Sequence, residues 1–306
     1  MNAKSNSSPP TRGHGFRAYF NEHDVEGVID LWVFRPIAEL MSIALAKTSI
    51  RPNQVSFASL LAGIAAFCCY YQSTYALTVA GGLLLGLSVV FDAADGQLAR
   101  RTGKGSEIGK LFDNVMDPIK SVIAFFGIAY GMDAAGTWGE WPAMPEWLTT
   151  YQAIWGLGWA AGLSITVQVV ARNYWVDLYD NYGKGRTSLT LANMDKVRVE
   201  MAALKQQKGL WLEKCVVPLV LVFSSKKPKP ELDSTPHPEY VERLRPFIRW
   251  WTMFDGAQQL FILVVASCFG LPVVGWLYIV LVSNAIMLVL TPATMMAHRK
   301  AVARGR

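Results

Sequence analysis

Four aspartates between residues 92 and 117 are the side chains of this chain best suited to chemistry. Asp92 and Asp95 are three positions apart, and Asp113 and Asp117 are four apart. On helices each pair shares one face, and the short segment between the pairs makes the two helices antiparallel neighbours. Four carboxylates that converge in this way repel one another where the dielectric is low. Divalent cations would bridge them, and a set of oxygen ligands favours Mg²⁺ or Mn²⁺.

Small and basic residues accompany these acids. Gly96 lies one helical turn before Arg100, and Gly109 forms an i, i+4 row with Asp113 and Asp117. The two glycines leave room beside the helix backbones for a bulky phosphate group. The alternative is a pair of boundary helices whose acids form salt bridges with the basic residues nearby, which are Arg100, Arg101, Lys104, Lys110 and Lys120. Four acids together with both glycines favour a metal and phosphate site over that alternative.

The elements that must position these acids are long apolar runs. The chain has 306 residues, of which 52% are hydrophobic and 17% charged. This composition excludes a disordered chain, a collagen-like fibre and a disulfide scaffold, and it disfavours an ordinary soluble domain. About 20 apolar residues cross a bilayer as a helix. We therefore predict an all-α integral membrane protein with six transmembrane helices, over residues 55–71, 77–99, 115–132, 153–171, 250–269 and 273–296.

The distribution of basic residues predicts the orientation of these helices. All 29 Lys and Arg fall in one set of alternate segments, namely 1–54, 100–120, 172–249 and 297–306. Cytoplasmic loops of membrane proteins carry such an excess, so both termini and the aspartate cluster should face the cytoplasm. Basic loops against an anionic inner leaflet also explain the net charge of +6 without a nucleic acid partner.

The predicted spans divide the chain into three parts. Residues 1–50 form a cytoplasmic segment, in which 29–49 are expected to be an amphipathic helix lying on the membrane surface. Residues 51–300 form the six-span domain, with a cytoplasmic insert at about 173–249, and residues 301–306 are a basic tail.

The stretch from Asp92 to Asp117 resembles the signature of the CDP-alcohol phosphotransferase family. That signature reads D-x2-D-G-x2-A-R-x8-G-x3-D-x3-D, and all eight of its fixed positions match here without a gap. The segment Arg51-Pro-Asn-Gln-Val-Ser56 is also similar to the Pro-Asn-x-x-Thr start of the family's first span, with Ser56 in place of threonine.

The resemblance implies a metal site and a general base. Asp92, Asp95 and Asp113 would hold two divalent cations, Mg²⁺ or Mn²⁺. Asp117 would complete that site and act as general base on the hydroxyl of the acceptor. The reaction is attack of an alcohol on the β-phosphorus of a CDP-alcohol, with release of CMP.

The remaining signature residues are implied to bind the nucleotide. Gly96 and Ala99 would leave space for the cytidine diphosphate, and Arg100 would contact its phosphates. Gly109 would allow the second helix to approach closely. The resemblance also implies a homodimer.

Three polar residues outside the signature have two interpretations each, and a fourth has one. Lys120 either binds an anionic group of the acceptor or extends to the membrane interface. Arg172 either binds the acceptor's phosphate, as arginines near this point do in relatives that use inositol phosphate, or is an ordinary cytoplasmic helix end. Asp255 is a pocket residue or a helix cap, and Asn284 is expected to form an interhelical hydrogen bond.

The function predicted from these features is a membrane transferase of phospholipid synthesis, with CDP-diacylglycerol as donor and a small polar alcohol as acceptor. One alternative is a CDP-choline or CDP-ethanolamine type enzyme with diacylglycerol as acceptor. That branch often has a histidine where this chain has Asn114. An alternative of another class is a divalent-cation transporter, which would spread its acids through the middles of the spans.

Overall fold

The computed structural model describes residues 25–103, 105, 120–133, 151–185 and 237–304. All regular secondary structure in these ranges is helical, without a strand. This confirms the all-α fold class for the described part of the chain.

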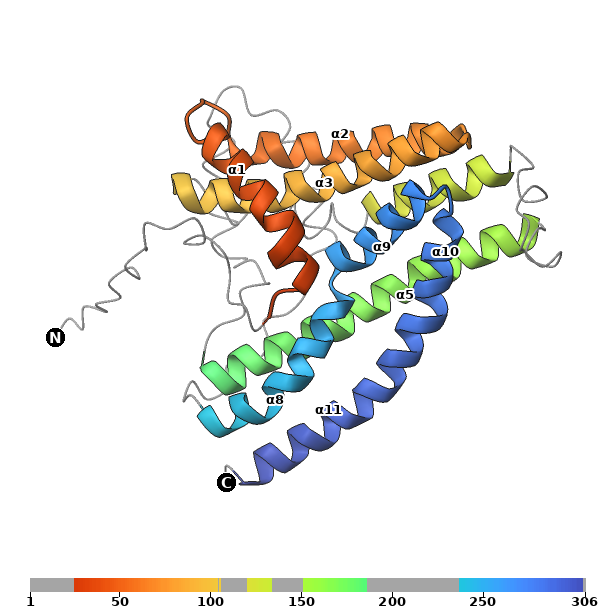
Figure 1. The fold of residues 1–306 in the computed structure, drawn as a ribbon. Coiled ribbons are helices and arrows are strands. Elements are labelled where there is room, and N and C mark those ends of the chain that lie inside the picture. The colour runs from red at the N-terminus through yellow and green to blue at the C-terminus, as the bar shows by residue number, and fades with distance from the viewer. Residues whose placement is uncertain (1–24, 104, 106–119, 134–150, 186–236, 305–306) are drawn as a thin grey trace, which may run out of the picture.

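Figure 1 shows the arrangement of the described helices. Their bounds are η1 Asp30–Phe34, α1 Arg35–Leu45, α2 Pro52–Tyr71, α3 Tyr75–Thr102, α5 Tyr151–Leu178, η4 Tyr179–Gly183, α8 Pro238–Trp251, η5 Thr252–Phe254, α9 Gly256–Cys268, α10 Pro272–Leu277, η6 Tyr278–Ser283 and α11 Asn284–Arg304. Residues 120–133 are also helical.

Four helical stretches among the described residues are long and apolar enough to cross a membrane, in agreement with an integral membrane protein. They are Pro52–Tyr71, Tyr75–Thr102, Tyr151–Gly183 and Pro272–Ala303. These match the first, second, fourth and sixth predicted spans. The predicted third span is described only from residue 120 onward, so the count of six stays a prediction.

The predicted fifth span is not one continuous helix. The chain leaves α8 at Trp251, makes the single 3₁₀ turn of η5, and becomes extended at Asp255 before α9 begins. The apolar helix that follows, Gly256–Cys268, has 13 residues. Asp255 causes this break as the N-cap of α9, because its Oδ1 accepts a hydrogen bond from the N–H of Gly256 at 3.0 Å.

The helix pair α2 and α3 positions the first half of the signature. The two helices run side by side (Figure 1), joined by a turn in which Ser73 has a φ of +50°. Two reciprocal hydrogen bonds hold α2 and α3 together near their middles. The hydroxyl of Ser59 donates to the carbonyl of Ser88, and the hydroxyl of Ser88 donates to the carbonyl of Ser59, each at 2.8 Å. This register places the C-terminal end of α3, which carries Asp92 and Asp95, beside the N-terminal end of α2.

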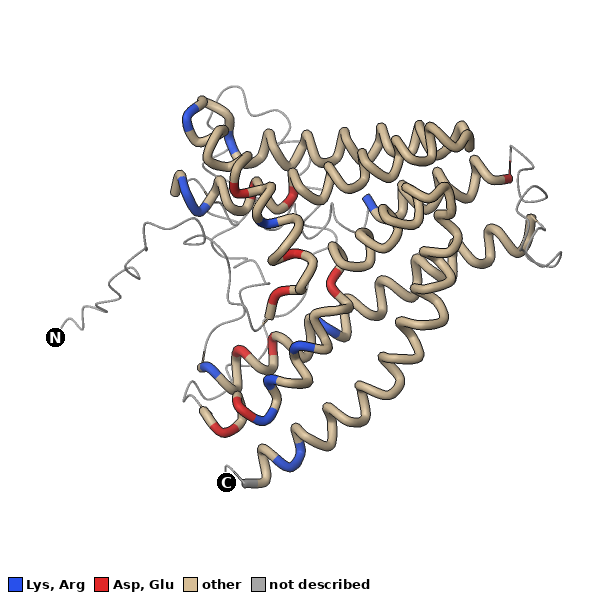
Figure 2. Tube along the Cα trace, viewed as in Figure 1, with Lys and Arg blue, Asp and Glu red and all other residues tan. Residues whose placement is uncertain are grey.

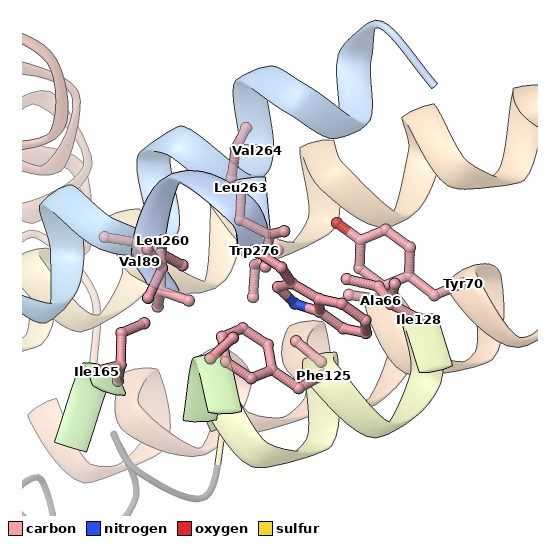
Figure 3. Close-up of a cluster of buried hydrophobic side chains, with 14 of the residues drawn as sticks. Ala66, Tyr70, Val89, Phe125, Ile128, Ile165, Leu260, Leu263, Val264 and Trp276 are labelled. Carbon is pink, nitrogen blue, oxygen red and sulfur yellow. The ribbon is translucent and has the colours of Figure 1, made fainter. Parts of the chain in front are cut away.

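The apolar core joins α2, α3 and residues 120–133 to the later helices. Figure 3 shows the Trp276 indole of α10 between Phe125 and Leu263, and the Phe125 and Trp276 ring centroids are 5.7 Å apart. Residues 120–133 lie directly on α2, since a Cβ added to Gly131 would come within 2.0 Å of the Tyr70 carbonyl oxygen. That contact fixes where Lys120, at the start of the segment, meets α2 and α3.

Charged residues gather toward one end of the bundle. Figure 2 shows acidic and basic residues on α1, at the end of α3, along α8 and near the end of α11, while the opposite halves of α2, α3 and α5 are almost free of them. The start of α2, the end of α3 and the end of α5 therefore share the charged end, and the signature residues of α3 lie there.

Candidate functional site

Helix α3 presents Asp92 and Asp95 three residues apart, at the charged end of the bundle. Asp95 is buried, and its Oδ2 accepts a hydrogen bond from the Ser56 hydroxyl on α2. Ser56 is the serine that replaces the expected threonine, and its contact gives that position a physical role. A hydroxyl that donates to a carboxylate fixes the orientation of the carboxylate.

Lys120 faces the other aspartate. Its Nζ lies 2.5 Å from Oδ1 of Asp92 and 3.2 Å from the hydroxyl of Ser59. The side chain of Lys120 is almost fully buried, so it does not extend to the membrane interface. Its ammonium instead supplies positive charge where the signature concentrates negative charge.

Gly96 and Arg100 adjoin the two aspartates on α3. A Cβ placed on Gly96 would meet only the guanidinium of Arg100, at 3.6 Å from Nη1. The arginine therefore folds back over the glycine, where its head would meet a phosphate bound along this face of α3. Ala99 is half-buried and lies beside Gly105.

The second half of the signature lies outside the described residues. This half contains Gly109, Asp113 and Asp117. No group of three potential metal ligands is formed by the described residues alone. The donor chemistry on α3 nevertheless fits a hard divalent cation, because Asp92 and Asp95 offer carboxylate oxygens and both already draw hydrogen-bond donors or positive charge.

Helix α1 is bound to the end of α3 by a buried ion pair. Glu39 is fully buried and pairs with Arg101, the residue after Arg100. Gln97 adds a hydrogen bond from its Nε2 to the carbonyl of Arg35 at 3.3 Å. The part of α3 that carries Gly96 and Arg100 is thus held in place by a helix more than 50 residues earlier in the chain.

Arg172, in the C-terminal part of α5, lies in a second polar group. Its Nη2 donates to the carbonyl of Val25 at 2.8 Å and lies 3.8 Å from Oδ2 of Asp255. Its Nη1 donates to Oδ1 of Asn173 at 2.9 Å. Its Nε is buried and has no hydrogen-bond partner within the described part of the chain. An arginine with a spare donor of this kind fits an anionic ligand.

The segment from Glu26 to Arg35 links these two groups. Glu26 and Arg35 form an ion pair of 2.8 Å, and Asp30 is buried between them. Burial, followed by the negative charge of Asp255, raises the pKa of Asp30 to about 7. Asp92 also contributes to this shift, so the Asp30 carboxyl lies within electrostatic range of both polar groups.

Several of these residues were not identified from the sequence. Ser59, Glu39 and Asp30 are single polar residues in apolar or amphipathic runs, and no spacing rule distinguishes them. The signal that could have found Glu39 is its charge on the apolar side of a surface helix. Asp255 is a cap, as one of its two interpretations held, and it also faces Arg172.

Comparisons with known proteins identify the family of this chain. The model of the CDP-alcohol phosphatidyltransferase family matches residues 49–207, which is just over half of the chain. The chain therefore belongs to the CDP-alcohol phosphatidyltransferase family, a family of transferases. The match covers α2, α3 and α5, which carry Ser56, the Asp92–Asp95 pair and Arg172.

Two curated relatives are both archaetidylinositol phosphate synthases. The protein of Pyrococcus horikoshii is 34% identical over 93 residues, which are 30% of this chain and 48% of the relative. The protein of Aeropyrum pernix is 37% identical over 83 residues, which are 27% of this chain and 41% of the relative. The similarity thus spans somewhat under half the length of each relative.

Proposed function

We propose that this protein transfers a phosphatidyl group from a CDP-linked lipid, such as CDP-diacylglycerol, to a small phosphorylated alcohol such as inositol phosphate, with release of CMP. The observation that carries the proposal is the pairing of Asp92 and Asp95 with Lys120 and Ser56 within an intact family signature. The names of the two relatives support an inositol phosphate acceptor.

The donor binds along the end of α3. Gly96 and Ala99 leave space for the cytidine diphosphate, and Arg100 moves from its position over Gly96 to its phosphates. Asp92, Asp95, Asp113 and Asp117 would hold two divalent cations, Mg²⁺ or Mn²⁺, which when bound offset the charge of the pyrophosphate and stabilise the CMP leaving group. Gly109 lets the helix that carries Asp113 and Asp117 approach α3.

Asp117 acts as the general base. It takes the proton of the acceptor hydroxyl as the oxygen forms a bond to the β-phosphorus of the donor, and the bond from that phosphorus to the CMP oxygen breaks. Positioning and electrostatics supply most of the rate enhancement in phosphoryl transfer. The Ser56 hydroxyl and the ammonium of Lys120 serve this by fixing the carboxylates of Asp95 and Asp92.

Arg172 binds the phosphate of the acceptor. Its guanidinium makes one full hydrogen bond to Val25 and one to Asn173, while its contact with Asp255 is 3.8 Å long. The buried Nε remains as a donor for an anion. The ammonium of Lys120 contacts Asp92, and from there it faces the incoming acceptor.

The remaining features of the proposal come from the sequence and from its resemblance to the family. The protein is a six-span integral membrane protein, with 29–49 on the membrane surface, an insert at about 173–249, and both termini and the site at the cytoplasmic face. The resemblance to the family implies that the protein works as a homodimer. The exposed apolar side chains Trp32, Ile37 and Leu40 on η1 and α1 support contact of this segment with lipid.

The test is CMP release by the purified protein with CDP-diacylglycerol, Mg²⁺ and a panel of acceptor alcohols. We expect release with inositol phosphate, and none after chelation of divalent cations. Asp113→Asn should abolish turnover while the circular dichroism spectrum and the elution volume stay unchanged. CMP release only with CDP-choline and diacylglycerol would overturn the proposed donor, and full activity of Asp113→Asn would overturn the metal site.

A further inference from the structure

A buried set of side-chain amides lies one helical turn deeper in the bundle than Arg172. Gln168 on α5 and Gln259 on α9 are almost completely buried. Nε2 of Gln259 donates to Oε1 of Gln168 at 3.0 Å. Nε2 of Gln168 in turn donates to Oδ1 of Asn284 at 2.7 Å, which confirms the interhelical hydrogen bond expected of Asn284.

Every amide hydrogen of this set has an acceptor. The second bond of Gln168 goes to the carbonyl of Ile279 at 3.2 Å, inside the π-helical turn η6. Asn284 donates to the hydroxyl of Ser164 at 2.8 Å and to the carbonyl of Val280 at 2.9 Å. A fully satisfied polar network in an apolar core makes the arrangement of its members rigid.

Two side-chain amides at the start of α9 stabilise the break between α8 and α9. Breaking a helix leaves backbone carbonyls without intrahelical partners. Nε2 of Gln258 donates to the carbonyl of Thr252 at 2.6 Å, and Nε2 of Gln259 donates more weakly to that of Met253 at 3.4 Å. These side chains hold the extended residue Asp255, which caps α9, at the position where it faces Arg172.

The register of α5 and α9 places two side-chain contacts between them, one helical turn apart. Arg172 follows Gln168 by four residues on α5, and Asp255 precedes Gln259 by four residues, at the start of α9. Residues four apart lie on one helix face. The contact of Gln168 with Gln259, at 3.0 Å, therefore lies one helical turn from the contact of Arg172 with Asp255, at 3.8 Å.

The contact of Arg172 with Asp255 is longer and weaker than the contact of Gln168 with Gln259. One oxygen of Asp255 is used by the N–H of Gly256, and 3.8 Å is too long for a hydrogen bond between its other oxygen and the guanidinium. The charge of Asp255 thus attracts the guanidinium of Arg172 without forming a hydrogen bond to it. The rigid contact of Gln168 with Gln259 is therefore suited to hold Arg172 where it can bind an anion.

We propose that Gln168 and Gln259 are positioning residues, which hold Arg172 and Asp255 in register so that the arginine meets the anionic group of the acceptor. The inference rests on the proposed function, in which Arg172 binds that group. Neither glutamine touches a substrate, and each acts through the residue one turn away from it. Their removal should weaken acceptor binding and leave donor binding intact.

The experiment compares Gln168→Met and Gln259→Met with the unchanged protein, each alone and combined with Arg172→Ala. Methionine keeps the volume and removes the amide. We expect each variant to raise KM for inositol phosphate by about tenfold, with KM for CDP-diacylglycerol and kcat within twofold of the unchanged protein. In the Arg172→Ala background the same substitutions should have no further effect on KM for the acceptor.

Ser267→Ala is the matched control. Ser267 is also buried on α9 and also forms an interhelical hydrogen bond, to Tyr70 at 2.8 Å, but it lies at the far end of the helix. It should leave both KM values unchanged. Should the methionine variants fail to fold, Gln168→Asn keeps the amide, shortens its reach by one methylene, and should raise KM for the acceptor alone.

The outcomes separate this inference from the function on which it rests. If Arg172→Ala leaves KM for the acceptor unchanged, the proposed role of Arg172 is wrong. If Arg172→Ala raises it but the glutamine variants do not, Arg172 binds the acceptor and the positioning role is overturned. An increase of the same size in both backgrounds, or an equal effect on the donor, would mean that the amides serve only helix packing.

Discussion

The ammonium of Lys120 lies 2.5 Å from Oδ1 of Asp92. The two residues are 28 positions apart, and the lysine is almost fully buried while the aspartate is one-quarter exposed. A buried lysine needs a negative partner, and here that partner is the first aspartate of the signature. The proposed metal site is therefore partly charge-compensated by the protein itself.

Lys120→Met should destabilise the metal-free protein. The substitution leaves the carboxylate of Asp92 without its nearest positive charge, at a cost of about 1–3 kcal/mol. Mg²⁺ should restore most of this loss, because it supplies the missing charge. Thermal unfolding in detergent, with chelator and with saturating Mg²⁺, measures both effects. Lys300→Met, at an exposed lysine of α11, is the control, and equal midpoints for the two variants in chelator would contradict the prediction.

Ser56→Ala should weaken binding of the divalent cation. Without the hydroxyl the carboxylate of Asp95 loses the donor that orients it, and loss of such an outer partner typically lowers metal affinity by roughly 10–100-fold. The Mg²⁺ concentration that gives half-maximal CMP release should rise by about tenfold at the low end of that range. Ser56→Thr keeps the hydroxyl and should behave as the unchanged protein. A normal Mg²⁺ dependence of Ser56→Ala would show that the hydrogen bond has no such role.

Glu39→Ala should detach α1 from α3. Glu39 is fully buried, and its loss removes a carboxylate that pairs with Arg101. Breaking a buried pair by removing one partner costs about 3 kcal/mol or more. We expect a lower unfolding midpoint and faster proteolysis between α1 and α2. The double variant Glu39→Ala with Arg101→Met removes both charges, and it should recover part of the stability. If it is no more stable than Glu39→Ala alone, the ion pair is not what holds α1.

The stability of the protein should fall as the pH rises toward neutrality, because of Asp30. Burial and the charge of Asp255 raise the pKa of this carboxyl from 3.8 to about 7 in the folded protein. Between these values the folded state holds a proton that the unfolded state has released. The resulting stabilisation is complete below pH 4, declines as the pH increases, and is lost above pH 7.

Asp30→Asn should flatten this dependence, since asparagine has no proton to lose. Its unfolding midpoint should exceed that of the unchanged protein at pH 8 and approach it at pH 5. Glu242→Gln, at an exposed acid of α8, is the control and should leave the pH profile as it is. Thermal unfolding from pH 5 to pH 8 tests this, and parallel profiles of Asp30→Asn and the unchanged protein would refute it.

The amino-acid sequence alone determined the helical class, four of the apolar spans, the eight-position signature and the family to which the chain belongs. These features are local. A span depends on about 20 consecutive apolar residues, and the signature depends on fixed spacings along two helices. The hydrogen bond of Asn284 was predictable for a similar reason, because an amide inside an apolar helix needs a partner wherever the helix packs.

Only the tertiary structure decided which partners meet. Lys120 faces Asp92, Glu39 pairs with Arg101, and Asp255 breaks the expected fifth span opposite Arg172. A membrane helix is apolar on all sides, so its sequence does not reveal which face meets which neighbour. That choice depends on close backbone contacts such as Gly131 against Tyr70. Those contacts set the register between helices, and the register brings distant charges together.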